Sequence, residues 1–475
     1  MGKCSIRKKG GAFLSFASLT FLYFFLPFTL LGYYLLPRAW RNGFLLAANL
    51  LFYAWGEPSF LVVILATTVI NFYAAKRMQA NPAHKKRWAI GAAVFDLGLL
   101  GIFKYTGFLL DILRPVFFWA DLPTVKIPLP LGISFYTFQV LSYIIDVYRQ
   151  DTIPQRSFTR FSTYMTLFPQ LIAGPIIRYR DLASQLGARQ QTLARFSGGI
   201  RLLLVGLGKK VLLANQMGAL WEALKVNPTE NGILGAWLGA IAFTLQIYFD
   251  FSGYSDMARG LGKLFAFELP INFDYPYISR SISEFWRRWH ISLGTWFRDY
   301  VYIPLGGSRK GPRKTICNLL VVWALTGLWH GASWNFVLWG LYYFALLALE
   351  KRWLANWLRT APRLLTHGYA MVFVTFGWVL FAFDDFGALE QYIRCLLLPN
   401  GSLIGHHAAV LFFTYLPLLI VAIAASLPMG KHIFDRFRTG KAAALVEIVS
   451  GSMVLLLCTA ALAAQTYNPF LYFRF

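Results

Sequence analysis

The chain has 475 residues, of which 57% are hydrophobic and only 14% are charged, and its mean hydropathy is +0.51. Apolar runs recur from one end to the other, which excludes an ordinary water-soluble protein and indicates a polytopic integral membrane protein. The formal net charge of +24 must lie almost wholly in loops, because the apolar runs are nearly free of charge. Such an excess is typical of cytoplasmic loops, and part of it can attract an anionic substrate or lipid headgroups. Beyond the charge, nothing supports nucleic acid as a partner.

The hydrophobic segments predict an all-α fold, because long apolar runs that cross a membrane are helical. In chain order the segments are residues 13–36, 44–55, 60–75, 89–103, 108–119, 130–149, 164–177, 196–214, 233–249, 319–347, 372–383, 409–425 and 443–464. We count about eleven to thirteen, and several are shorter than the roughly 20 residues that a span needs. The pair Gly174-Pro175 predicts irregular backbone at membrane depth, which protein or a watery cavity must cover.

The segment 319–347 is long enough to cross a bilayer and contains no Asp, Glu, Lys or Arg. It does contain His330, near its middle and directly after Trp329. An ionisable side chain at membrane depth costs roughly 2 to 3 kcal/mol or more, so it is usually kept for a proton, an ion or a substrate. His330 is therefore a functional candidate, and the alternative is a neutral imidazole that is hydrogen-bonded to a neighbouring helix and purely structural.

Two carboxylates, Asp250 and Asp256, lie at the end of the segment 233–249, among aromatic and small residues. They can be catalytic, can hold a cation, or can pair with Arg259 and later arginines. Pairing is the structural alternative, because charges inside a membrane usually pair with one another.

Residues 281–297 predict one amphipathic helix with a wide aromatic face, which includes Trp289. Ser281 or Ser283 can cap its N-terminus. Such a helix suits the membrane interface, with its tryptophans at headgroup level. His290 lies within the aromatic face, where it serves either packing and headgroup contact or, together with His330, a shared chemical site.

The loop 305–314 is rich in glycine and in cations, which include Arg309 and Lys310. It is not a phosphate-binding P-loop, because Pro312 and Arg313 stand where Lys and Ser or Thr are required. It can hold the phosphates of an acyl carrier or be an ordinary basic loop beside the membrane.

Other standard signatures are missing, namely GxSxG, HExxH, GxGxxG after a strand, and CxxC. The four cysteines lie far apart, at Cys4, Cys317, Cys395 and Cys458. Neither a disulfide framework nor a metal site is therefore predicted.

Two blocks of the sequence resemble the signature blocks of the membrane-bound O-acyltransferases. They are WRRWHISLGTWFRDYVYIPLGG at 286–307 and LTGLWHGASWNFVLWG at 325–340. Three further stretches are similar to the bacterial branch that acts in alginate acetylation: PLGISFYTFQVLSYIIDVYR, LFPQLIAGPIIRYR and QIYFDFSGYSDMARGLG. The resemblance runs from about residue 13 to about residue 350 and fades toward the C-terminus.

The resemblance implies one integral membrane acyltransferase domain over residues 1–475, with the family motifs in about 128–350 and less diagnostic helices in 364–475. The implied fold is a ring of membrane helices around a core of tilted or re-entrant helices, with a tunnel to the catalytic histidine. By motif position, His330 corresponds to the essential histidine of the family and His290 to the second polar residue of the site. Trp289, Trp329, Arg309, Lys310, Asp250 and Asp256 are candidates for binding substrate.

The resemblance also implies the reaction. Relatives take an acyl group from a cytoplasmic donor, commonly acetyl-CoA, with no bound cofactor or metal, and pass it across the bacterial inner membrane. A periplasmic or extracellular partner acyltransferase, SGNH-like, then modifies polysaccharide hydroxyls, among them those of alginate or peptidoglycan. We expect His330 to be the base, and His290 to polarise the thioester carbonyl or to orient the acceptor.

Two alternative functions stay open. Relatives in a neighbouring chemistry transfer D-alanine to teichoic acid from a carrier protein. A proton-coupled transporter or exporter would use His330 and Asp250 as relays, but such proteins often show inverted repeats, and none is visible in this sequence.

Overall fold

The computed structural model describes residues 14–119, 121–125, 127–172, 174–398, 403–430, 436 and 441–464. Within these residues the regular structure is helical, as the sequence predicts, and contains no β-strand. The start of the first predicted segment and Cys4 lie outside the described residues.

The helices follow one another along the chain with short connections. The first part contains η1 (Phe21–Phe25), α1 (Leu26–Leu35), α2 (Arg41–Gly56), η2 (Pro58–Phe60), α3 (Leu61–Ala80), η3 (Pro82–His84), α4 (Lys85–Leu100), η4 (Gly101–Tyr105) and α5 (Thr106–Leu113). The middle contains α6 (Ile133–Arg149), α7 (Phe158–Thr166), α8 (Phe168–Leu171), α9 (Tyr179–Gly187), α10 (Leu193–Gly208), η5 (Lys209–Ala214), α11 (Asn215–Lys225), α12 (Pro228–Leu264) and η6 (Pro276–Ile278). The last part contains α13 (Ile282–Arg288), α14 (Ile291–Phe297), η7 (Arg298–Tyr302), α15 (Pro312–His330), α16 (Trp334–Leu349), η8 (Glu350–Leu354), α17 (Ala355–Thr360), α18 (Arg363–Ala382), α19 (Phe386–Leu397), α20 (His406–Ala425) and α22 (Lys441–Ala464).

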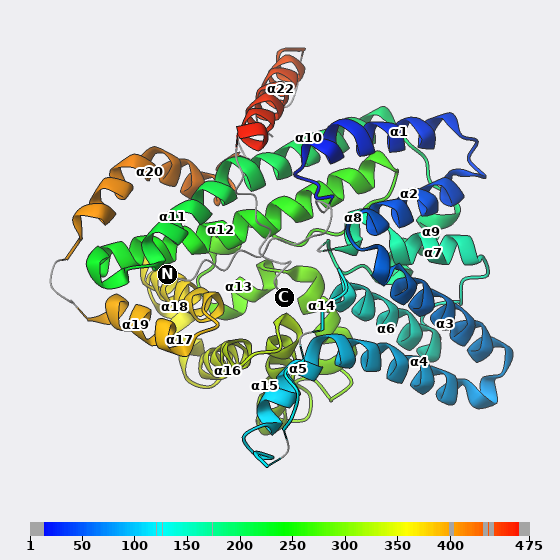
Figure 1. The fold of residues 1–475 in the computed structure, drawn as a ribbon, viewed down its shortest axis with the longest axis horizontal. Coiled ribbons are helices and arrows are strands. Elements are labelled where there is room, and N and C mark those ends of the chain that lie inside the picture. Colours follow the sequence, from blue (N-terminus) through cyan, green and yellow to red (C-terminus); the bar gives the residue numbers. More distant parts are fainter. Residues whose placement is uncertain are drawn as a thin grey trace.

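Longer helices surround a centre that contains the short helices α13 and α14 (Figure 1). The longest helix, α12, is kinked near its start, where Gly232 has φ 71° and ψ 174°. It is mostly buried and packs along α10 and α11. The middle of the ring is therefore built from short pieces of helix whose ends meet other helices, which is where the candidate histidines lie.

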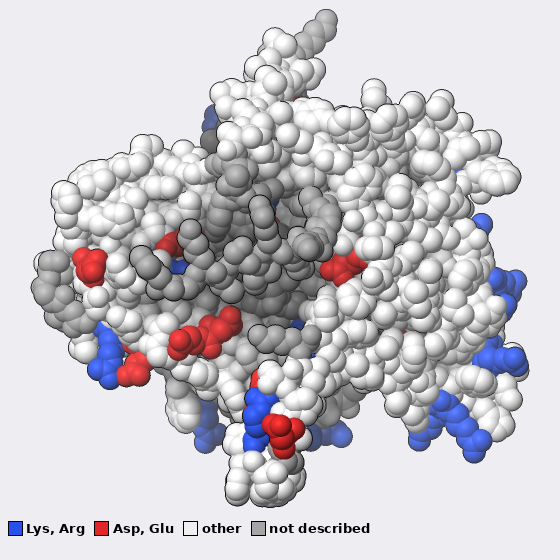
Figure 2. All heavy atoms as spheres, viewed as in Figure 1, with Lys and Arg blue, Asp and Glu red and all other residues white. Residues whose placement is uncertain are grey.

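Six helical runs within the described residues are long and apolar enough to cross a membrane. They are Pro58–Ala80, Pro82–Leu113, Pro228–Leu264, Arg363–Ala382, His406–Ala425 and Ala443–Ala464. These runs confirm a polytopic α-helical membrane protein. Most of the surface visible in Figure 2 is uncharged, and Lys and Arg side chains gather at its lower right edge, near the ends of α3 and α4.

Three predicted segments are corrected by the structure. The segment 89–103 and the first part of the segment 108–119 belong to one continuous run, Pro82–Leu113, because Lys104 lies inside a π-helical turn and does not end the helix. Conversely, the segment 319–347 is not one helix. It ends as α15 at His330, passes through extended backbone at Gly331 and Ser333, and restarts as α16.

The hairpin of α15 and α16 depends on two glycines at its contact. A Cβ atom on Gly327 would lie 2.4 Å from the carbonyl oxygen of Phe336, and one on Gly340 would lie 2.4 Å from that of Trp323. Backbones can approach this closely only where no side chain stands between them. The close contact fixes the end of α15, and with it His330.

The carboxylates of α12 pair with lysines of η5. Lys210 Nζ lies 2.6 Å from Asp250 Oδ1, and Lys209 Nζ lies 2.7 Å from Asp256 Oδ2. Arg259 adds a contact of 3.3 Å to Asp256. The sequence left pairing as the structural alternative, and pairing is observed, although the main partners are lysines of η5 and not later arginines.

We expect Gly340→Ala to lower the apparent melting temperature in detergent, because the added methyl group meets backbone and overpacking costs about 1–3 kcal/mol. Gly368→Ala on α18 is the matched control, since its Cβ would meet nothing within 4 Å. That control should melt at or slightly above the wild-type temperature, because alanine favours helix. Equal melting of the two variants would contradict the close contact.

Replacing one member of the buried pair Lys210–Asp250 should destabilise the protein strongly. Asp250→Asn leaves a lysine without its ion-pair partner in an apolar interior, which costs about 3–5 kcal/mol. The double variant Lys210→Met/Asp250→Leu should recover much of the loss, because two apolar side chains replace the pair. Thermal unfolding of the two single variants and the double variant measures the coupling between Lys210 and Asp250. A loss in the double variant equal to the sum of the two single losses would show that the pair is not coupled.

Candidate active site

Two buried histidines meet at one tryptophan. His330 is the last residue of α15 and is 3% exposed, while His290 precedes α14 and is 1% exposed. The ring centroid of Trp329 lies 5.0 Å from that of His330 and 5.9 Å from that of His290. The structure therefore brings together the two imidazoles that the sequence predicts for a shared site.

The single helix expected over 281–297 is broken at this point. α13 ends at Arg288. His290 has φ 46° and ψ 52°, a left-handed backbone conformation that residues other than glycine rarely adopt. Such strain persists only where the surroundings enforce it, and it is concentrated at functional sites. The pieces are also buried at the centre of the molecule, so His290 is not in contact with lipid headgroups.

The end of α15 is capped from a distant helix. Lys104 Nζ donates hydrogen bonds to the carbonyl oxygen of Trp329 and, at 3.0 Å, to Ser134 Oγ. Tyr105 OH donates to the carbonyl oxygen of Leu328 at 2.7 Å. The last carbonyls of a helix lack partners within it and carry partial negative charge, so a cation is favourable there.

Lys104 was not among the residues predicted from the sequence. The available signal was its position directly after the apolar residues 89–103, since a lysine within a membrane helix is costly and usually functional.

A second missed residue, Glu350, holds the start of α13. Its carboxylate accepts hydrogen bonds from Ile282 N at 2.6 Å and Ser283 N at 2.9 Å. Ser281 Oγ accepts from Glu284 N at 3.0 Å, which confirms the predicted serine cap. A carboxylate satisfies the free N–H groups of a helix start and complements its dipole, so α13 and the histidine that follows it are firmly placed.

Aromatic side chains form the walls of the site. His330 lies 4.9 Å from Trp339 and 5.4 Å from Phe381, measured between ring centroids. Trp289 is 1% exposed and lies 4.7 Å from Trp378. The walls of the site are therefore apolar, which disfavours water beside the imidazoles.

Four buried donors in this wall have no hydrogen-bond partner among the described residues. They are Trp286 Nε1, Trp339 Nε1, Trp378 Nε1 and Tyr343 OH. Tyr343 lies 4.8 Å from Trp286 and 5.1 Å from Trp339, so the donors form one cluster that reaches His330 through Trp339. Buried polar groups are normally paired, and neutral donors of this kind suit the carbonyl oxygens of an uncharged ligand.

Among the other predicted binding residues, the two of the basic loop lie far from His330. Arg309 and Lys310 are exposed and precede α15, whereas His330 ends it, and 19 helical residues span roughly 28 Å. Asp250 and Asp256 are paired with lysines of η5. Only a ligand as long as this helix could therefore contact both the basic loop and the imidazoles.

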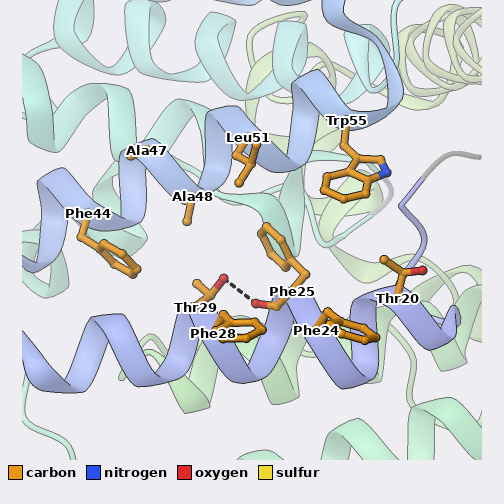
Figure 3. A pocket seen from close by; sticks show the side chains of 10 residues that line it. All are labelled: Thr20, Phe24, Phe25, Phe28, Thr29, Phe44, Ala47, Ala48, Leu51 and Trp55. Atoms are coloured by element: carbon orange, nitrogen blue, oxygen red, sulfur yellow. Dashed lines mark hydrogen bonds between the residues drawn. The ribbon is translucent and has the colours of Figure 1, made fainter. Parts of the chain in front are cut away.

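An open apolar cavity of about 430 Å³ lies between α1 and α2, away from the site (Figure 3). Its lining residues are Thr20, Phe24, Phe25, Phe28, Thr29, Phe44, Ala47, Ala48, Leu51 and Trp55. It offers no titratable side chain, so it suits a hydrocarbon chain better than chemistry. Within the described residues, no group of three or more His, Cys, Asp or Glu side chains could hold a metal ion.

Comparison with known proteins places the chain in a family. The model of the MBOAT, membrane-bound O-acyltransferase family, matches residues 149–386. The probable alginate O-acetylase AlgI of Pseudomonas putida is 39% identical, with 97% of this chain and 100% of the relative covered. The peptidoglycan O-acetyltransferase of Helicobacter pylori is 31% identical, with coverage of 83% and 81%. The teichoic acid D-alanyltransferase of Streptococcus thermophilus is 31% identical over 47% of this chain and 57% of the relative. The chain therefore belongs to the membrane-bound O-acyltransferase family and is a multi-pass membrane O-acyltransferase.

Proposed function

We propose that this O-acyltransferase takes an acetyl group from cytoplasmic acetyl-CoA and passes it across the membrane for O-acetylation of an extracytoplasmic polysaccharide. Two relatives are named as an alginate O-acetylase and a peptidoglycan O-acetyltransferase. These names support an acetyl group as the group transferred and a polysaccharide as its acceptor. The observation that carries the proposal is the pair of buried imidazoles on Trp329 inside an aromatic wall. Acyl transfer to a hydroxyl needs a proton acceptor and the exclusion of water, and this arrangement supplies both.

The chemistry follows from the site. The hydroxyl oxygen attacks the thioester carbon, its proton goes to an imidazole, the carbon–sulfur bond breaks, and the thiolate takes the proton back. A buried imidazole stays neutral and can accept a proton, because burial disfavours its charged form. The unpaired donors around Tyr343 would bind neutral carbonyl groups of the donor, and Arg309 and Lys310 would contact its phosphates at the far end of α15.

The proposal includes a location and a partner. The chain would lie in the inner membrane of a bacterium, in contact with lipids, and a periplasmic or extracellular SGNH-like acyltransferase would deliver the acetyl group to the polymer. One other donor has specific support, because a teichoic acid D-alanyltransferase is among the relatives. In that case a carrier protein would bring the acyl group.

His330→Ala should lower CoA release from radiolabelled acetyl-CoA, and transfer of label, by roughly 100-fold or more, since a positioned acid or base typically contributes that much. Purified protein in nanodiscs is suitable for the assay. His84→Ala is the control, because His84 is an exposed residue between α3 and α4. Unchanged release from His330→Ala would remove the histidine from the mechanism. Binding of an acyl carrier protein, without any release from acetyl-CoA, would favour D-alanyl transfer.

Tyr343→Phe should raise the KM for acetyl-CoA by roughly 3- to 10-fold, the effect of one lost hydrogen bond. It should not lower the melting temperature, because the deleted hydroxyl has no partner among the described residues. Tyr392→Phe is the matched control, since Tyr392 OH donates to the carbonyl oxygen of Ala236 at 2.7 Å. The control should lose about 1 kcal/mol of stability and keep its KM. The reverse pattern would show that the Tyr343 hydroxyl is structural.

A further inference from the structure

The turn that carries His290 is held by Asn272, a residue in the connection between α12 and η6. The Asn272 side chain is 1% exposed, and its Oδ1 accepts from Ser292 N at 3.1 Å and from Ser292 Oγ at 2.9 Å. The backbone oxygen of Asn272 also accepts from Ile291 N at 3.0 Å. Side chain and backbone of one asparagine thus fix the residues that directly follow the histidine.

Asn272 also determines which ring nitrogen of His290 carries the proton. Oδ1 of Asn272 lies 3.2 Å from His290 Nδ1. The orientation of the amide is set independently, because the backbone N–H of Ser292 can only donate and must therefore face the oxygen. An amide oxygen can only accept, so Nδ1 must be the N–H of the neutral imidazole. The lone pair of the ring is then on Nε2.

Nε2 of His290 is available for chemistry. No group within the described part of the chain forms a hydrogen bond with it. The His290 ring stands at 88° to the ring of Phe251, with 4.7 Å between the centroids. It also contacts Trp329, and His330 contacts the same tryptophan from the end of α15. A buried acceptor without a partner beside the second imidazole is a place for a donor that arrives with the substrate.

We infer that Asn272 is a positioning residue that holds His290 in the Nδ1–H form, so that Nε2 accepts the proton of the attacking hydroxyl. The inference rests on the proposed acyl transfer. In this step the O–H bond breaks and its proton goes to Nε2, while the oxygen bonds to the acyl carbon and the carbon–sulfur bond breaks. The imidazolium then returns the proton to the thiolate.

The roles of the imidazoles then differ from those expected from the sequence. Polarising the thioester carbonyl requires an N–H that points at it, and the N–H of neutral His290 is already donated to Asn272. His290 therefore faces the acceptor, and its proton-accepting role replaces the one first given to His330.

Two variants of Asn272 distinguish a role in positioning His290 from a role in stabilising the fold alone. Asn272→Leu removes the acceptor of Nδ1–H, so kcat for acetyl transfer should fall roughly 10-fold or more while the KM for acetyl-CoA changes little. Asn272→Asp keeps an acceptor and adds a negative charge that favours the imidazolium. The acid limb of the pH dependence of kcat should therefore move up by roughly one unit, with activity recovered at higher pH.

The matched control is Asn49→Leu. Asn49 is likewise a buried asparagine whose Oδ1 accepts from a backbone N–H, that of Phe168 at 3.2 Å, but it lies on α2. Activity is compared per folded protein, as measured by size-exclusion chromatography. If Asn272→Leu loses no more kcat than Asn49→Leu, or if the acid limb of Asn272→Asp coincides with that of wild type, the inference is overturned. If wild type itself transfers no acetyl group, the proposed function fails instead.

Discussion

Every polar group that is buried in an apolar interior needs a partner, and this requirement organises the protein. A membrane offers no water to satisfy a stray N–H, carbonyl or charge. The ends of the central helices are therefore satisfied by side chains from elsewhere: Lys104 and Tyr105 at the end of α15, and Glu350 at the start of α13. These caps stabilise short helices in the interior, and they place both histidines.

Some of the buried polar atoms that lack a partner within the described residues lie in the candidate site. Nε2 of His290 and the indole and phenol donors around Tyr343 are buried without partners within the described residues. They share one aromatic region with His330, whereas the carboxylates of α12 are paired. A cluster of neutral donors and an acceptor without partners beside His330 is suited to a ligand that brings carbonyl groups and a hydroxyl.

Composition and motifs were sufficient to predict the class of fold and the family, because these depend on local sequence. The motifs also singled out the two histidines that the structure brings to one tryptophan. The irregular conformation at His290 was not predictable, since residues 281–297 have the pattern of one helix and the break is enforced by Asn272 from another segment. Lys104 and Glu350 were missed for the same reason. Their partners are 225 and 68 positions away in the chain, and periodicity carries no information about such contacts. The basic loop with Arg309 is evident from the sequence. Its distance from His330 follows only from the structure, in which α15 begins at this loop and ends at His330.

The proposed function requires that an acetyl group pass from one side of the membrane to the other. It is tested most directly in sealed proteoliposomes, with radiolabelled acetyl-CoA on one side only and the partner acyltransferase with its polysaccharide on the opposite side only. If the acetyl group crosses the membrane, label reaches the polymer and CoA is released on the donor side, in one orientation of the protein. Label that reaches the polymer only when donor and acceptor share a side would contradict it.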